Sequence, residues 1–367
     1  MGWLLLCHTG CGDYSKAYGV SMQGLCTTAL DHFRQGMLKL ESSPYAPPHA
    51  HFKDRFYQLA VDTAAMLEDN PTTSAGRGSN PTVSERIELE SCVMTDTQEL
   101  GCVTCVTECR NPCRLAMAIL REAQHERLLG RRPPRILTGA GADRFAHRCG
   151  LGDAHAQSYL LTGRRLAACR KWKAVLQQAE NLTKRAKTDA TTTSTSTCDG
   201  DDQDSVRDTV GLVAVHTSGA IIAIVSSGGH ILKDDGRVGL AGVPGAGVWV
   251  DPQNHEDGTI TQSATITTGT GEDVLSTMLA RGCTRDAVAK FRQRFPSTAF
   301  AALSLTLTGT KHRDAGEVQL TRATIDVSQQ HAGLVFGYAT HHAEPETFMK
   351  VSPHQQIAVS LDGQREQ

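Results

Sequence analysis

The chain has 367 residues, of which 40 % are hydrophobic, and its formal net charge is −2. This length can bury a large core, as one big domain or two ordinary ones. The near-neutral charge gives no general attraction to nucleic acid or membrane, and the sequence has no apolar run of the 18 residues that a membrane span needs. The 12 cysteines are most simply thiols, so we expect a soluble intracellular protein, nuclear or cytoplasmic.

The first quarter of the chain predicts a strand and two helices. Trp3–Cys7 is too short for a signal sequence and predicts a strand, which leads into a Gly-containing segment at residues 8–12. Two helices follow, each with one stripe of mostly apolar residues at helical spacing, so we expect both stripes to pack inward. The stripes are Leu25, Ala29, Phe33 and Met37 in the first helix, and Phe56, Leu59, Thr63, Met66 and Leu67 in the second.

Residues 70–80 form a Gly-rich loop that lacks the Lys-Ser/Thr ending of a P-loop, which favours a structural loop near a site over nucleotide binding. Four cysteines follow, separated by gaps of two, three and three residues: Cys102, Cys105, Cys109 and Cys113. Zinc sites usually pair two-residue gaps on separate turns, so we expect buried thiols in a strand and the helix after it. The short segment Gly139-Ala140-Gly141 predicts a turn.

Two basic clusters lie between Arg164 and Lys187. They suit either a solvated surface or a bipartite nuclear-import signal, and both interpretations stay open. Residues 191–204 are mainly Thr, Ser and Asp with no apolar face, which predicts a disordered loop over about residues 188–208. Such a loop fits a linker between domains, or the flexible segment before a self-cleavage site.

An apolar hairpin follows this loop. Two β-branched runs, 209–216 and 220–227, flank Thr217-Ser218-Gly219, and their continuous apolarity predicts two strands buried on both faces. With Ser218 at the tip, Thr209 and Ser227 are equally far from the turn. They are therefore expected to be cross-strand partners, with their hydroxyls together at an open strand end.

The last third predicts polar loops and more strands. A strand at Ser263–Thr268 is followed by a tight turn at Gly269-Thr270-Gly271 and a helix over 272–279 whose first turn is acidic. Backbone amides at such a turn point outward, so Gly269 is a good place to receive a developing negative charge. Further strands are expected at residues 301–307, 321–327, 333–338 and 357–361.

Four segments, in their order and spacing, resemble the N-terminal-nucleophile hydrolases of the type-2 asparaginase family, and most closely the threonine aspartases (taspases) within it. They are Asp208-Thr209-Val210-Gly211, Ser226-Ser227-Gly228-Gly229, Gly236-Arg237-Val238-Gly239 and Thr267-Thr268-Gly269-Thr270-Gly271-Glu272. Shorter matches at residues 8–12, 67–69, 75–80, 91–96, 110–112 and 133–134 extend the resemblance over most of the chain.

The resemblance implies an α+β fold, a four-layer αββα sandwich formed by residues 1–367 as a single domain. It also implies a precursor that cleaves itself into an α fragment (residues 1–208) and a β fragment (residues 209–367) and assembles as an (αβ)2 homodimer. No metal or cofactor is implied.

The same resemblance assigns site residues. Cleavage after Asp208 makes Thr209 the N-terminal nucleophile, whose freed α-amine then serves as base for its own hydroxyl. Ser227 orients the nucleophile, and the Thr268 hydroxyl with the Gly269 amide forms the oxyanion hole. Arg237 clamps a substrate carboxylate, and Gly271 belongs to the same substrate-binding side.

One departure bears on the substrate. Asparaginases and isoaspartyl peptidases bind the substrate ammonium with an Asp three residues after the Arg, where this chain has Leu240. Because a leucine cannot neutralise an ammonium, an endopeptidase that cuts proteins after an internal Asp is favoured. Two alternatives stay open: an L-asparaginase or isoaspartyl peptidase for small substrates, and a non-catalytic scaffold that binds acidic peptides through Arg237.

A second departure is in the Gly-rich loop. Where the family has Phe-Asn-Ala-Gly, this chain has Thr73-Ser74-Ala75-Gly76. The support of the active-site strand is therefore expected to differ.

Overall fold

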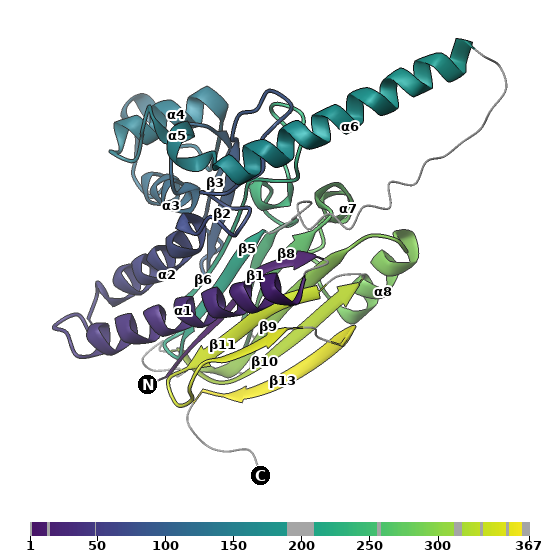
Figure 1. Cartoon of the computed structure of the whole chain (residues 1–367). Coiled ribbons are helices and arrows are strands. Elements are labelled where there is room, and N and C mark those ends of the chain that lie inside the picture. Colours follow the sequence, from purple (N-terminus) through teal and green to yellow (C-terminus); the bar gives the residue numbers. More distant parts are fainter. Residues whose placement is uncertain are drawn as a thin grey trace.

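The structure is a computed structural model, and it describes residues 2–12, 15–47, 49–188, 209–254, 258–311, 318–330, 333–349 and 352–361. The elements of the first half are β1 (Trp3–Gly12), α1 (Lys16–Glu41), α2 (Phe52–Asp69), β2 (Leu89–Thr95), β3 (Leu100–Val106), α3 (Pro112–Glu122), η1 (Leu128–Gly130), β4 (Ile136–Thr138), α4 (Gly139–Arg148), α5 (Ala156–Leu160) and α6 (Gly163–Thr188). Those of the second half are β5 (Val210–His216), β6 (Ile221–Ser227), η2 (Leu240–Gly242), β7 (Val248–Asn254), β8 (Thr259–Gly269), α7 (Gly271–Thr277), α8 (Arg285–Arg294), β9 (Phe300–Lys311), β10 (Val318–Gln330), β11 (Gly333–Thr340), β12 (Glu346–Met349) and β13 (His354–Ser360). Figure 1 shows α1 to α5 on one side of a stack of strands, α8 beside the other end of the stack, and the long helix α6 projecting from the body.

The strands form two sheets. The larger has the order β12-β11-β1-β5-β6-β2-β3-β4, and the smaller has the order β13-β10-β9-β8-β7. Neighbouring strands run antiparallel, except β3 and β4, which run parallel. The two strands of the predicted hairpin, β5 and β6, therefore lie in the middle of the larger sheet.

Each face of the larger sheet has its own apolar core. Helices α1, α2 and α3 cover one face, where α1 contacts β11, α2 contacts β5 and α3 contacts β3. The opposite face packs against the smaller sheet. All residues of β5 and β6 are buried, which explains why both strands are apolar without alternation.

The hairpin register is the predicted one. Val210 pairs with Ser226 and Val215 pairs with Ile221, so the turn is centred on Ser218. Continuing this register by one residue places Thr209 opposite Ser227, at the end of the hairpin. The prediction that two hydroxyls meet there is confirmed by a hydrogen bond between them.

Several elements differ from the sequence-based expectations at their ends. The predicted strand Trp3–Cys7 continues to Gly12, because its second half pairs with β11 across a bulge at His8 and Gly10. Gly139-Ala140-Gly141 is the first turn of α4 and not an isolated turn. The helix expected over 272–279 spans Gly271–Thr277, because Met278 has a left-handed backbone that ends it.

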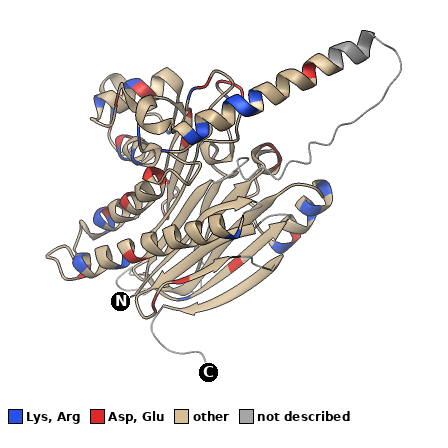
Figure 2. Cartoon of the chain, in the orientation of Figure 1, with Lys and Arg blue, Asp and Glu red and all other residues tan. Residues whose placement is uncertain are grey.

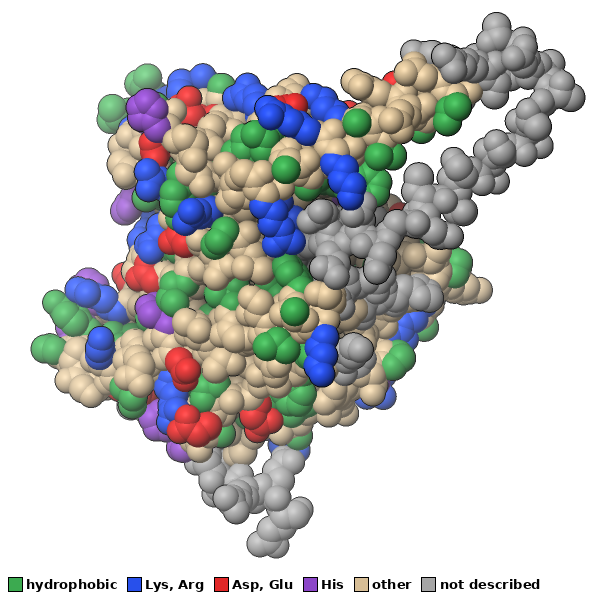
Figure 3. All heavy atoms as spheres, in the orientation of Figure 1, with side chains coloured by type: hydrophobic (Ala, Val, Ile, Leu, Met, Phe, Trp, Pro, Cys, Tyr) green, Lys and Arg blue, Asp and Glu red, His purple; other side chains and the backbone are tan. Residues whose placement is uncertain are grey.

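The basic clusters fall within the range of α6, and Figure 2 shows bands of Lys and Arg along the first part of this helix. On the face shown in Figure 3, Lys and Arg side chains are frequent where α3 to α6 lie, with acidic side chains among them. A fully solvated basic surface is wrong for Arg165, which is 1 % exposed and donates from Nε to the Gly78 carbonyl. The predicted disordered loop lies outside the described residues, apart from Thr188 at the end of α6.

None of the helices in the described ranges combines the length and apolar character that crossing a bilayer requires.

Candidate active site

Thr209 lies at the start of a row of three polar residues on neighbouring strands. The Thr209 hydroxyl donates to Ser227 Oγ at 3.3 Å, and the Gly229 amide donates to the same oxygen at 3.0 Å. Ser227 on β6 pairs directly with Glu90 on β2. Because directly opposed residues of antiparallel strands point to the same face, these three side chains project to one side of the larger sheet. All three are buried.

The row opens into a cavity of about 230 Å³. The cavity brings together residues of β2 and β6, the residue before β5, the loop before η2 and the start of η2, the end of β8 and the start of α7. Its lining residues are Glu90, Thr209, Ser227, Gly229, His230, Arg237, Leu240, Gly269, Thr270, Gly271 and Glu272. The site therefore lies where both sheets end side by side.

Arg237 supplies the positive charge of the cavity. Its Nε and Nη2 contact the same oxygen of Glu272, at 2.8 and 2.7 Å. Burial works against ionisation of Glu272, but the Arg237 charge and hydrogen bond outweigh it and lower the pKa of that carboxyl. The Glu272 side chain is 56 % exposed, against 14 % for Arg237, so Glu272 is a partner that can leave while the guanidinium stays in place.

Glycine at position 271 makes room for Arg237. A Cβ added there would lie 2.4 Å from Arg237 Nη2, much closer than two such atoms approach in proteins. The close approach of backbone and guanidinium therefore requires glycine at this position. This contact relates Gly271 to the cavity by way of Arg237.

Gly269 and Thr268 end β8 beside this cavity. Gly269 has φ +131°, and a Cβ there would lie 2.4 Å from the Ala299 carbonyl, so glycine is needed here too. The Thr270 amide is already bonded to that carbonyl. Thr268 Oγ1 is buried and makes no hydrogen bond to any described residue. A buried hydroxyl without a hydrogen-bond partner can donate to an oxyanion that forms beside it.

Glu90 is a buried carboxylate that the sequence analysis did not single out. It is 2 % exposed, and its Oε2 accepts from the Gly239 amide at 2.6 Å. Desolvation raises the pKa of Glu90, and the charges of Lys233 and Arg237 oppose this rise. Lys233 is buried as well and donates to the Glu88 carbonyl at 2.6 Å. Desolvation lowers the pKa of Lys233.

The Gly-rich loop supports the strand end from behind. The Gly228 amide donates to the Ser74 carbonyl, and the Ser74 hydroxyl and Asn80 Nδ2 both donate to the Gly229 carbonyl, at 3.2 and 2.9 Å. Ser74 also accepts from Asn80 Nδ2 at 3.0 Å. The departure at residues 73–76 thus still gives the loop a polar contact with the residues that follow Ser227.

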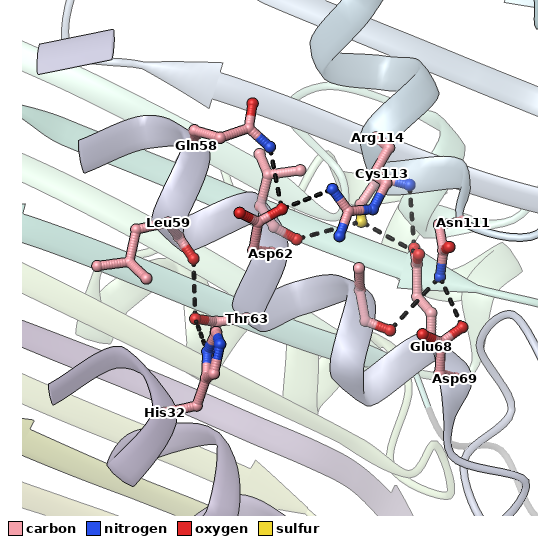
Figure 4. Close-up of polar contacts among 12 residues, drawn as sticks. His32, Gln58, Leu59, Asp62, Thr63, Glu68, Asp69, Asn111, Cys113 and Arg114 are labelled. Atoms are coloured by element: carbon pink, nitrogen blue, oxygen red, sulfur yellow. Dashed lines mark hydrogen bonds and ion pairs between the residues drawn. The ribbon is translucent and has the colours of Figure 1, made fainter. Parts of the chain in front are cut away.

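Figure 4 shows how the end of α2 holds the start of α3, with Glu68 and Asp69 directed at Asn111 and Cys113. Glu68 Oε1 accepts from the Cys113 amide at 3.0 Å, and Asp69 accepts from Asn111 Nδ2 at 3.0 Å. Burial raises the pKa of Glu68 to about 7, although its hydrogen bonds oppose this. The matches at residues 67–69 and 110–112 therefore carry a structural junction outside the cavity.

Three of the four clustered cysteines are buried as expected, Cys102 on β3, Cys109 after it and Cys113 at the start of α3. Cys105 is only partly buried. Among the described residues, no group of three or more His, Cys, Asp or Glu side chains is arranged to hold a metal ion.

Most of the predicted site residues meet in one place. The same cavity is lined by Thr209, Ser227, Arg237, Gly269 and Gly271. Thr268 directly precedes the lining residue Gly269 in the sequence. Asp208 lies outside the described residues.

The lining residues that were given no site role from the sequence are Glu90, Gly229, His230, Thr270 and Glu272. In the sequence, Glu272 was seen as an acid in the first turn of a helix and as the last residue of a segment that resembles the family. Glu88 and Glu90 alternate with Ile87 and Leu89, a pattern typical of a solvated strand face. That face instead meets the second sheet, so only tertiary structure reveals Glu90.

A family model described as asparaginase matches residues 55–349. The chain is 28 % identical over 222 residues to an isoaspartyl peptidase/L-asparaginase of Danio rerio, covering 60 % of this chain and 59 % of that protein. It is 32 % identical over 226 residues to the protein of the same description in Rattus norvegicus, covering 60 % and 56 %. It is also 28 % identical over 214 residues to an N(4)-(β-N-acetylglucosaminyl)-L-asparaginase of Elizabethkingia miricola, covering 58 % and 51 %. The chain thus spans between half and three fifths of the length of these relatives.

Proposed function

The chain belongs to the type-2 asparaginase family of N-terminal-nucleophile hydrolases, and we propose that it is a threonine endopeptidase of the threonine aspartase kind. It cleaves its own Asp208–Thr209 bond and then cleaves protein substrates after an internal Asp. The observation that carries this proposal is Leu240, which lines the cavity together with Arg237. The cavity offers a guanidinium for a carboxylate, and an apolar side chain where an ammonium would need an anion.

Self-cleavage begins with Thr209 in the intact chain. Its hydroxyl, held by Ser227, attacks the Asp208 carbonyl carbon, and the Thr209 nitrogen leaves that carbon as the acyl group moves to the oxygen. The departing nitrogen takes up the hydroxyl proton and becomes a free α-amine. Water then hydrolyses the ester, which releases the Asp208 carboxylate and regenerates the Thr209 hydroxyl. The reaction consumes one water and needs no cofactor.

In later turnovers the α-amine takes the hydroxyl proton while Thr209 Oγ attacks the main-chain carbonyl of a substrate Asp. The developing oxyanion is stabilised by the Thr268 hydroxyl and the Gly269 amide. The leaving amine receives the proton, and water hydrolyses the acyl-enzyme ester. The substrate's side-chain carboxylate takes the place of the Glu272 carboxylate on Arg237.

A second candidate is an L-asparaginase or isoaspartyl peptidase for small substrates. It is favoured by the descriptions of the relatives from Danio rerio and Rattus norvegicus, and by Glu90, which gives the cavity a carboxylate despite Leu240.

The remaining expectations belong to the same proposal. We propose one domain of four αββα layers, made of an α fragment (residues 1–208) and a β fragment (residues 209–367) and assembled as an (αβ)2 homodimer. Nuclear or cytoplasmic location is proposed with it, and the basic clusters of α6 would serve as the import signal in the nuclear case.

Intact-mass analysis of the wild type and Thr209→Ala tests the proposal, followed by incubation of the mature enzyme with a peptide library that contains Asp. We expect two wild-type fragments that meet at 208/209, an intact variant, and cuts after Asp. Ammonia release from asparagine without any peptide cleavage selects the second candidate. A wild-type chain that stays whole at neutral pH overturns self-cleavage and favours a non-catalytic binding protein.

A further inference from the structure

The two carboxylate oxygens of Glu90 differ in their hydrogen bonds. Its Oε2 accepts from the Gly239 amide, whereas its buried Oε1 hydrogen-bonds to none of the residues that the structure describes. The other acid that lines the cavity, Glu272, is engaged by Arg237. A buried acceptor without a donor is costly, so Glu90 Oε1 is suited to a donor that arrives with a ligand.

The position of Glu90 relates it to both ends of the substrate site. Through the pairing of β2, β6 and β5 it stands in line with Ser227 and Thr209. On its other side, a Cβ added to Gly239 would lie 2.4 Å from Glu90 Oε1 and equally 2.4 Å from Arg237 Nη1. Glu90 therefore lies between the nucleophile and the guanidinium.

An aspartyl residue bound here has three groups to satisfy around its α-carbon. The reacting carbonyl goes to Thr209 and the carboxylate goes to Arg237, which leaves the α-nitrogen as a donor that loses its water on entering the cavity. Leu240 has no acceptor to offer. We infer that Glu90 accepts a hydrogen bond from the α-nitrogen of the residue whose carboxylate Arg237 binds, and thereby favours substrates that carry an N–H donor on this α-carbon.

This inference rests on the proposed function and deepens it. In a protein substrate the donor is a main-chain N–H, and in a free amino acid it is an ammonium. Both are N–H donors on the same carbon, so one acceptor serves either, and the choice of substrates separates them.

A purely structural role is the competing explanation, because Glu90 also anchors the Gly239 amide. Glu90→Gln separates the two roles. The amide oxygen keeps the bond to Gly239, while the amide NH2 meets the substrate N–H donor to donor. Glu88→Gln is the matched control, since Glu88 Oε2 anchors the Gly236 amide of the same loop at 2.8 Å and does not line the cavity.

The test compares kcat/KM of the mature enzymes on a peptide with an internal Asp and on the same peptide with that α-nitrogen methylated. We expect methylation to cost the wild type and Glu88→Gln about 10- to 100-fold, the usual range for a hydrogen bond to a charged group. For Glu90→Gln the unmodified peptide loses a similar factor, and methylation costs nothing further. If methylation lowers kcat/KM of Glu90→Gln by the same factor as in the wild type, the two losses are independent and the inference is overturned.

A second pair of substrates keeps this outcome separate from the endopeptidase proposal. If peptides are not cut but asparagine is hydrolysed, the endopeptidase proposal fails, and asparagine is then compared with succinamic acid, which lacks the α-nitrogen. A wild-type preference for asparagine that vanishes in Glu90→Gln supports the inference, and an unchanged preference refutes it. Where nothing is turned over, calorimetry with Thr209→Ala compares aspartate with succinate, and equal affinities refute it.

Discussion

Thr209 Oγ1 lies 3.3 Å from Ser227 Oγ across the open end of the β5–β6 hairpin. The Gly229 amide donates to the same Ser227 oxygen, so this oxygen is held in place by the backbone that follows it. With its partner fixed in this way, Thr209 would need little reorganisation to act as the nucleophile that we propose. The contact follows from strand register alone, because Ser227 is the residue opposite Thr209 when the turn is centred on Ser218.

Ser227→Ala tests this contact. Loss of the hydroxyl leaves Thr209 without its acceptor, and we expect self-cleavage to slow by about 10- to 100-fold. Ser226→Ala is the matched control, because it removes a buried hydroxyl from the next position of the same strand, where the side chain points to the opposite face. Gel densitometry of the two fragments over time gives the rates. Equal slowing in both variants would show that strand stability, and not the hydroxyl contact, sets the rate.

The nucleophile end of the site was predictable because it depends on short-range patterns. Two β-branched runs around one Gly-containing turn fix a register, and a register fixes which side chains are opposite each other. The charged end of the site was harder to predict from the sequence. Arg237 was found only through a family motif, and Glu90 joins it because β2 enters the sheet beside β6, a pairing between residues 137 apart in the chain. No local pattern encodes that pairing.

In the fold, too, local patterns predicted some elements, whereas others depend on residues that are far apart in the chain. The apolar stripes of α1 and α2 and the buried hairpin were predicted from periodicity, whereas β12, with four residues, has too little length to show a period. The continuation of β1 to Gly12 was missed because its partner, β11, is more than three hundred residues away.

Gly271→Ala tests the glycine that makes room for Arg237. Its added methyl would lie 2.4 Å from Nη2, so the guanidinium must move, and we expect KM for an Asp-containing peptide to rise about tenfold or more with little loss of stability. Gly141→Ala is a suitable control, because a Cβ there meets no atom within 4 Å. Steady-state kinetics of both variants on this peptide measure the change in KM. Unchanged KM in Gly271→Ala would mean that Arg237 does not bind the substrate carboxylate.

Glu272→Gln tests whether the chain's own carboxylate competes with the substrate. The Glu272 carboxylate forms an ion pair with the Arg237 guanidinium, with contacts at 2.7 and 2.8 Å. A neutral amide binds a guanidinium less tightly than a carboxylate does. We therefore expect KM to fall by several-fold at similar kcat. Raising the salt concentration should narrow the difference, since Glu272 is largely exposed and screened. A higher KM would instead show that Glu272 holds Arg237 in its productive orientation.

Glu68→Gln tests the buried carboxyl below the Gly-rich loop. Burial raises the pKa of Glu68 from 4.5 to about 7. A carboxyl whose pKa is higher in the folded state contributes stability that is fully present below its unfolded pKa and is lost as the pH rises through its folded pKa. We therefore expect wild-type stability to fall between about pH 4.5 and 7, by up to roughly 3 kcal/mol from this group.

Two buried histidines act in the opposite direction from Glu68. Burial lowers the pKa of His8 to about 3 and that of His216 to about 4, so their contribution to stability is lost as the pH falls below about 6.5. Glu68→Gln keeps the shape and an acceptor oxygen for the Cys113 amide, so its urea midpoint should change less than that of the wild type from about pH 4.5 to 7. Parallel pH profiles in the two proteins would show that Glu68 is ionised at neutral pH.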